Sequence, residues 1–123
     1  MCFSKFTMVL FILALLMGSA VDATSLTYPR VTPTTGDHGT TFTFTVHYAG
    51  EEPVLMEVYL DGNGYEMLEV DSSDENYTDG KDYYYETVLP EGTTIYYFKA
   101  MVGPEGEFRT TASTVHVESV GLG

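Results

Sequence analysis

The sequence predicts an all-β protein, a Greek-key β-sandwich of about seven strands, and three observations support this fold class. Phe, Val and Tyr alternate with Thr and His along residues 40–48, and a period of two places the apolar side chains on one face of a strand. Turn signals recur about every ten residues, and no helical period follows the N-terminal apolar segment. Because a single strand cannot bury its own apolar face, a second sheet is expected to pack against this one.

The first half of the chain supplies four of these strands, including residues 40–48. Residues 25–36 contain two prolines, which cannot donate a backbone hydrogen bond, so an edge strand or an extended lead-in is predicted there. Residues 54–60 alternate again, and Asp61-Gly-Asn-Gly64 holds two overlapping hairpin signals because Gly and Asn tolerate a positive φ. A returning strand is therefore expected at residues 65–70.

The second half supplies three more strands, which follow a long loop. Residues 71–81 are polar and acidic and form the longest predicted loop. Strands are expected at residues 82–89, 93–101 and 107–118, and the turns between them contain Gly and Pro.

Residues 1–23 have the three regions of a secretory signal peptide. A short segment carries Lys5, an apolar run covers residues 6–17, and small residues follow. The apolar run is too short to span a bilayer comfortably. Cleavage is predicted after Ala20 or Ala23, and the sequence leaves both positions open. We expect a secreted protein that is extracellular or associated with the cell envelope.

The predicted mature chain is one domain without disulfides. Residues 24–120 are assigned to the β-sandwich and residues 121–123 to a short tail, because about 100 residues are enough for one core and too few for two. The only cysteine, Cys2, lies in the predicted leader. A secreted chain without disulfides points to export from a prokaryotic cell, archaeal or bacterial.

The protein is strongly acidic. It has 18 Asp and Glu against five Lys and Arg, which gives a formal net charge of −13 at pH 7. Such a surface repels the phosphates of nucleic acids and anionic lipid headgroups. We therefore expect no nucleic-acid partner, and no membrane insertion once the leader is removed.

Three groups of residues resemble one protein family. They are Val31-Thr-Pro-Thr-Thr-Gly36, Val58-Tyr-Leu-Asp-Gly62, and Leu89-Pro-Glu-Gly92 followed by Tyr96-Tyr-Phe98. Their order and spacing are similar to the immunoglobulin-like modules found, usually in tandem, in secreted and surface proteins of archaea and bacteria. The resemblance implies an immunoglobulin-like sandwich with a role in surface contacts. It also implies a tyrosine corner, in which the ring of Tyr96 is buried and its hydroxyl bonds to the backbone.

No motif for catalysis is present. The sequence has no Gly-x-Ser-x-Gly elbow, phosphate-binding loop or His-Glu-x-x-His motif. No catalytic or cofactor-binding residue is assigned, and the protein is predicted not to be an enzyme. The main hypothesis is a secreted, non-enzymatic adhesion module that contacts proteins or the cell envelope.

A carbohydrate-binding module is the first alternative. Tyr59, Tyr84 and Tyr97 are expected on the solvent faces of their strands, where exposed rings can stack on sugars. Residues 89–96 are also similar to the end of starch- and glycogen-binding modules. The partner would then be a glycan at the cell surface.

Two further alternatives concern assembly and inhibition. The extended residues 24–33 could pair with the sheet of a neighbouring subunit and build a homo-oligomer or an extracellular filament. Thr32-Pro-Thr-Thr-Gly36 is similar to the Asn-Pro-Thr-Thr-Gly loop of chagasin-like cysteine protease inhibitors, with Thr32 in place of Asn. The other two loops of those inhibitors are absent from the sequence, which makes inhibition the remote alternative.

The acidic loop holds the candidate metal ligands and a candidate glycosylation site. Calcium prefers several carboxylate and carbonyl oxygens on a flexible loop, and this stretch contains Asp71, Asp74, Glu75, Asp79 and Asp82. A solvated acidic loop explains the same residues, and the three histidines lack metal-ligand spacing, so no metal is assigned. Asn76-Tyr-Thr78 is an acceptor sequon for N-glycosylation.

Overall fold

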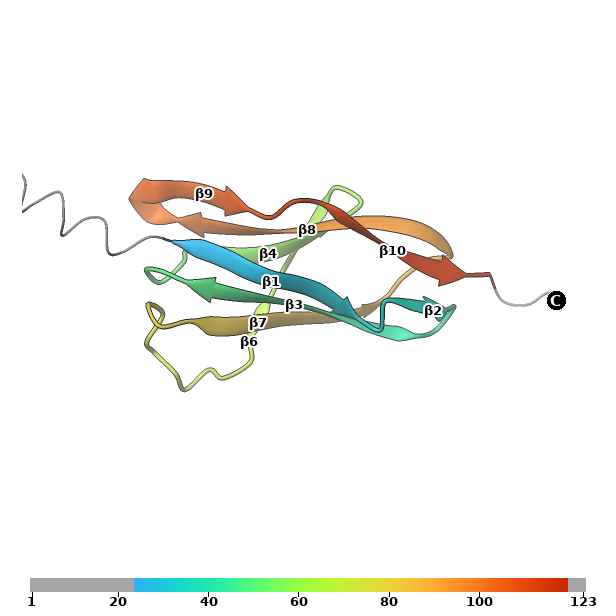
Figure 1. Ribbon diagram of the computed structural model, residues 1–123, viewed down its shortest axis with the longest axis horizontal. Helices are drawn as coiled ribbons and strands as arrows, with labels where there is room; N and C mark the ends of the chain where they lie inside the picture. Colours follow the sequence, from blue (N-terminus) through green and yellow to red (C-terminus); the bar gives the residue numbers. More distant parts are fainter. Residues whose placement is uncertain (1–23, 120–123) are drawn as a thin grey trace, which may run out of the picture.

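The protein is a sandwich of two β-sheets (Figure 1). The computed structural model describes residues 24–119, so the predicted signal peptide and the predicted tail lie outside the described residues. Four strands form sheet A, in the order β1 (Ser25–Thr32), β3 (Thr41–Ala49), β7 (Lys81–Val88) and β6 (Leu68–Glu69).

Six strands form sheet B. Five follow one another in the order β2 (Thr35–Asp37), β10 (Ser113–Glu118), β8 (Gly92–Val102), β4 (Leu55–Leu60) and β5 (Asn63–Glu66), and β9 (Gly106–Arg109) also pairs with β8. The pairing of β2 with β10 is parallel, and the other pairings are antiparallel. Within residues 24–119 the only helix is the 3-10 turn Gly103–Glu105. The predicted all-β class is confirmed, and the two sheets form a sandwich.

The core is built by the alternation that the sequence predicts. The inward side chains of β3 are all buried, namely Phe42, Phe44, Val46 and Tyr48. They belong to one cluster with the inward side chains of sheet B, including Met56, Val58, Phe98 and Ala100. The rings of Phe44 and Tyr96 meet edge to face across the two sheets, with centroids 5.1 Å apart. Burial of these two apolar faces against each other holds the sheets together.

Residues 24–119 contain ten strands where about seven were predicted, because three predicted strands are each divided. The stretch predicted at 65–70 crosses between the sheets at Met67, which is buried and donates its backbone N–H to Met56 O at 2.9 Å. The stretch predicted at 107–118 is interrupted at Thr110, whose side chain accepts a hydrogen bond from Phe98 N at 3.0 Å. A side-chain hydroxyl replaces a ladder bond there, which ends the strand. The predicted lead-in likewise divides into β1 and β2, in different sheets.

Two local predictions have mixed outcomes. Asp61 and Gly62 form the two-residue turn between Leu60 and Asn63, with φ values of 50° and 89°, as the Asp-Gly signal predicts. Val54, however, falls on the same side of the alternation at residues 54–60 as Met56, which is buried, and Val54 is 75% exposed. It lies just before β4, so the alternation does not extend to it.

The tyrosine corner differs from the one that the family resemblance implies. Tyr96 is buried as the family resemblance implies, but no described group accepts a hydrogen bond from its hydroxyl. The bond from a buried tyrosine to the backbone is made instead by Tyr48, whose hydroxyl donates to Glu51 O. The tyrosine that bonds to the backbone is therefore at the end of β3, and its acceptor lies three residues later in the chain.

Candidate binding site

Sheet A carries a strained bulge in its edge strand. Thr27 pairs with His47 and Arg30 pairs with Thr45, so two residues of β1 oppose one residue of β3. Tyr28 lies inside this bulge with a φ of 54°, a left-handed conformation that is uncommon for a bulky residue. It is 72% exposed. A residue held in such a conformation at an exposed position is typical of functional sites.

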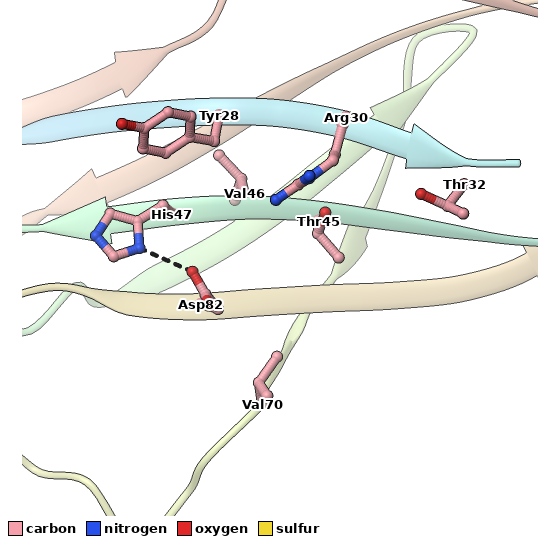
Figure 2. Close-up of a pocket in the computed structure, with 8 residues that line it drawn as sticks. All are labelled: Tyr28, Arg30, Thr32, Thr45, Val46, His47, Val70 and Asp82. Atoms are coloured by element: carbon pink, nitrogen blue, oxygen red, sulfur yellow. Dashed lines mark hydrogen bonds and ion pairs between the residues drawn. The ribbon is translucent and has the colours of Figure 1, made fainter. Parts of the chain in front are cut away.

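A basin of about 290 Å³ lies on the outer face of sheet A, next to the bulge (Figure 2). Its wall is formed by side chains from three neighbouring strands: Tyr28, Arg30 and Thr32 on β1, Thr45 and His47 on β3, and Asp82 on β7. Val70, which follows β6 and is 59% exposed, adds an apolar edge. Residues that are more than 50 positions apart in the chain therefore meet in one site.

His47 is held in place on both sides of its ring. Its Nδ1 lies 2.8 Å from Oδ1 of Asp82, the residue directly opposite it on β7. Its Nε2 lies against Gly80, where an added Cβ would come within 2.3 Å of this nitrogen. Only glycine allows the loop to approach this closely. The imidazole is therefore a positioned part of the wall, fixed by Asp82 at Nδ1 and by the close approach of Gly80 beside Nε2.

Arg30 is the cation of the basin. The other three Lys and Arg side chains of residues 24–119 pair with carboxylates, namely Lys81, Lys99 and Arg109, and Arg30 forms no ion pair. Figure 2 shows its side chain running from β1 toward β3. A guanidinium stays charged at any physiological pH and presents a rigid set of donors. An unpaired guanidinium on a protein of net charge −13 is a place where an acidic group can bind.

The structure brings together two of the three tyrosines predicted to stack on sugars. Tyr59 and Tyr97 lie opposite each other on the outer face of sheet B, with ring centroids 4.9 Å apart and planes 2° from parallel. Lys99 Nζ lies 4.8 Å from the Tyr59 centroid and Arg109 Cζ lies 5.2 Å from the Tyr97 centroid. The two rings are thus already covered in part by each other and by these cations.

The third tyrosine lies on the other sheet. Tyr84 is on β7, between Thr45 of β3 and Leu68 of β6. The three predicted residues therefore do not share one flat face. Among the described tyrosines that line a hollow, Tyr28 is the most exposed.

The acidic loop is organised around an internal cation. The side chain of Lys81 is 1% exposed, and its Nζ lies 2.7 Å from Oε1 of Glu69. The ammonium also donates to the backbone carbonyls of Asp71 and Asp74, and it lies 4.6 Å from the ring centroid of Tyr77. Burial by itself lowers the pKa of Lys81, but the hydrogen bond and charge of Glu69 outweigh it and raise the pKa. Loop oxygens of the kind that a calcium ion would use thus bind this ammonium.

Two of the carboxylates considered for calcium, those of Asp71 and Asp74, accept hydrogen bonds within turns of the loop. Oδ1 of Asp71 accepts from Ser73 Oγ at 2.6 Å and from Ser73 N at 3.1 Å, and these bonds lower the pKa of Asp71. Oδ1 of Asp74 accepts from Asn76 N at 2.9 Å. No group of three or more His, Cys, Asp and Glu within residues 24–119 is arranged to hold a metal ion.

The remaining candidate segments lie on the surface. Asn76 is exposed, and its Oδ1 accepts hydrogen bonds from Thr78 N and Oγ1, so the sequon forms a compact turn. Its glycosylation stays a prediction. Residues 32–36 join β1 to β2, and β1 pairs with β3 of its own chain. Protease inhibition and strand exchange also stay predictions.

Tyr28, Arg30 and Asp82 were not recognised as one site from the sequence. Two signals were present: a proline directly after Tyr28, which disfavours regular strand pairing, and one of the few basic residues of an acidic chain. Neither signal predicts the strand register that places Asp82 opposite His47.

Comparisons with known proteins do not assign the chain to a family. A scan against protein-family models and a search of curated proteins both find no match. In the part of the chain that the structure describes, no helix is long and apolar enough to cross a membrane.

Proposed function

We propose that the protein is a secreted, non-enzymatic recognition module of the immunoglobulin-like Greek-key class that works at or near the cell surface. The strand orders support this fold class: β1-β3-β7-β6 packs on β2-β10-β8-β4-β5, and the chain changes sheets after β1, β2, β3, β5 and β7. Immunoglobulin-like sandwiches distribute their strands in this way. The predicted leader supports secretion, and the basin on the outer face of sheet A supports a binding role.

The outer face of sheet A is the proposed contact surface. The observation that carries this proposal is the strained Tyr28 in its bulge, which lies beside the unpaired Arg30 at the basin. Strain at an exposed residue costs stability, so it is expected to be retained where it serves contact with a partner. The outer face of sheet B offers fewer unpaired groups to a partner. There the rings of Tyr59 and Tyr97 stack on each other, and Lys99 and Arg109 lie over these rings.

A labelling experiment tests which face makes the contact. The predicted mature chain has no cysteine, so Thr45→Cys introduces a single thiol in the basin and Ile95→Cys introduces one on the outer face of sheet B. Each variant is coupled to a bulky maleimide and incubated with intact cells of the producing organism. Label at position 45 should abolish cell association, and label at position 95 should leave it unchanged. Cell association that survives the label at position 45 would contradict the proposal.

A further inference from the structure

We infer that the basin on sheet A binds a sugar that carries a single carboxylate, such as a hexuronic acid residue of a surface glycan. This inference rests on the proposed function, because it names the ligand of the same face. It concerns residues different from the tyrosines that the sequence suggested for sugar stacking.

Arg30 selects the charged group. Its guanidinium has no carboxylate partner in the described part of the chain, and a planar carboxylate can accept two parallel hydrogen bonds from it. Asp82 is the one carboxylate of the basin wall, and its Oδ1 already accepts from His47 at 2.8 Å. The basin is thus the part of this acidic surface where an added carboxylate finds a free cation and limited repulsion.

The remainder of the wall suits a sugar ring. Tyr28, Thr32 and Thr45 each present a hydroxyl, and none of the three is hydrogen-bonded to a described group. Hydroxyls of this kind can both donate to and accept from those of a sugar. Tyr28 is 72% exposed and offers an aromatic face for the C–H groups of a pyranose. A volume of about 290 Å³ is at the small end of ligand sites, which suits one ring.

The net charge of the protein restricts the ligand further. A polymer with an anionic group on every sugar would be repelled by a protein of charge −13. At physiological salt, screening limits the range of this repulsion to about 8 Å. An isolated carboxylate on an otherwise neutral glycan meets Arg30 within that range and avoids most of the repulsion.

The test is an NMR titration of the mature protein with methyl glucuronide, methyl glucoside and acetate. Methyl glucuronide should saturate with a dissociation constant on the order of 1 mM and shift the resonances of Tyr28, Thr45 and His47. Arg30→Gln should weaken this binding at least about tenfold. Arg109→Gln is the matched control, because it removes an arginine on sheet B that pairs with Glu107. It should leave the affinity unchanged, and unchanged melting temperatures show that both variants are folded.

Each other outcome overturns the inference. If methyl glucoside binds as tightly as the glucuronide, the carboxylate is not selected, and if acetate binds as tightly, the sugar ring contributes nothing. Absence of glucuronide binding, or full binding by Arg30→Gln, removes the assigned site. The outcome is separable from that of the labelling experiment: the label at position 45 can abolish cell association without any uronide binding, and uronide binding can occur although that label has no effect on cells.

Discussion

Lys81 Nζ lies 2.7 Å from Oε1 of Glu69, and the same ammonium donates to two backbone carbonyls of the acidic loop, those of Asp71 and Asp74. One buried cation therefore joins β7, β6 and the loop between them. Its charge faces a carboxylate that is itself only partly exposed, so removal of either partner leaves an uncompensated group in a poorly hydrated place.

Substitution of Lys81 should loosen the loop and destabilise the sandwich. Lys81→Met leaves Glu69 and two carbonyls without their donor, and we expect the melting temperature to fall by roughly 10 °C. Hydrogen exchange of residues 71–80 should become faster than in the parent protein. The double variant Lys81→Met, Glu69→Leu should recover part of the loss, because it removes both charges. A single variant as stable as the parent would show that the loop does not depend on this cation.

Salt should stabilise the protein, and calcium should act only as salt. At a net charge of −13, repulsion among the acids opposes the compact state and is screened as ionic strength rises. We expect the melting temperature to increase with NaCl from millimolar to molar concentration. Because the ammonium of Lys81 binds loop carbonyls, calcium and magnesium at matched ionic strength should give equal shifts. Saturable stabilisation by calcium at low concentration would reveal a real site, and indifference to salt would mean that repulsion is equal in the unfolded chain.

Stability should fall at alkaline pH, in part through Tyr83. Burial raises the pKa of Tyr83 above its ordinary value of 10.0, and nearby Glu69 raises it further. Above pH 10 the folded protein thus holds a proton that the unfolded chain releases, so its contribution to stability is complete below pH 10 and is lost as the pH rises. The free energy of unfolding of Tyr83→Phe should decline less between pH 9 and 11 than that of the parent. Tyr84→Phe, on the opposite side of β7, is the control. An equally steep decline in Tyr83→Phe would contradict the assignment.

The central strand should show the predicted division between its two faces. Phe44 is 0% exposed and packs on Tyr96, so Phe44→Ala should reduce the free energy of unfolding by about 3–5 kcal/mol. Thr43→Ala, the next residue on the solvent side of β3, should change it by about 0.5 kcal/mol or less. Chemical denaturation of both variants measures the difference. Equal losses would mean that β3 does not separate a core face from a solvent face.

The all-β class, the solvent and core faces of the central strands, and the Asp61-Gly62 turn could all be predicted from the order of residues. These features follow from local rules, because side chains alternate along a strand and a tight turn needs residues that accept a positive φ. The alternation at residues 41–49 and the buried Phe98 and Ala100 of β8 agree with that expectation.

Which side chains come into contact depends on the tertiary fold. Strand register placed Tyr59 against Tyr97 and separated both from Tyr84, and it placed His47 opposite Asp82. The bulge at Tyr28 brought Arg30 to the basin, and the position of Lys81 decided what the acidic loop surrounds. Register, bulges and sheet crossings depend on packing between segments far apart in the chain, so a local pattern of residues does not contain them.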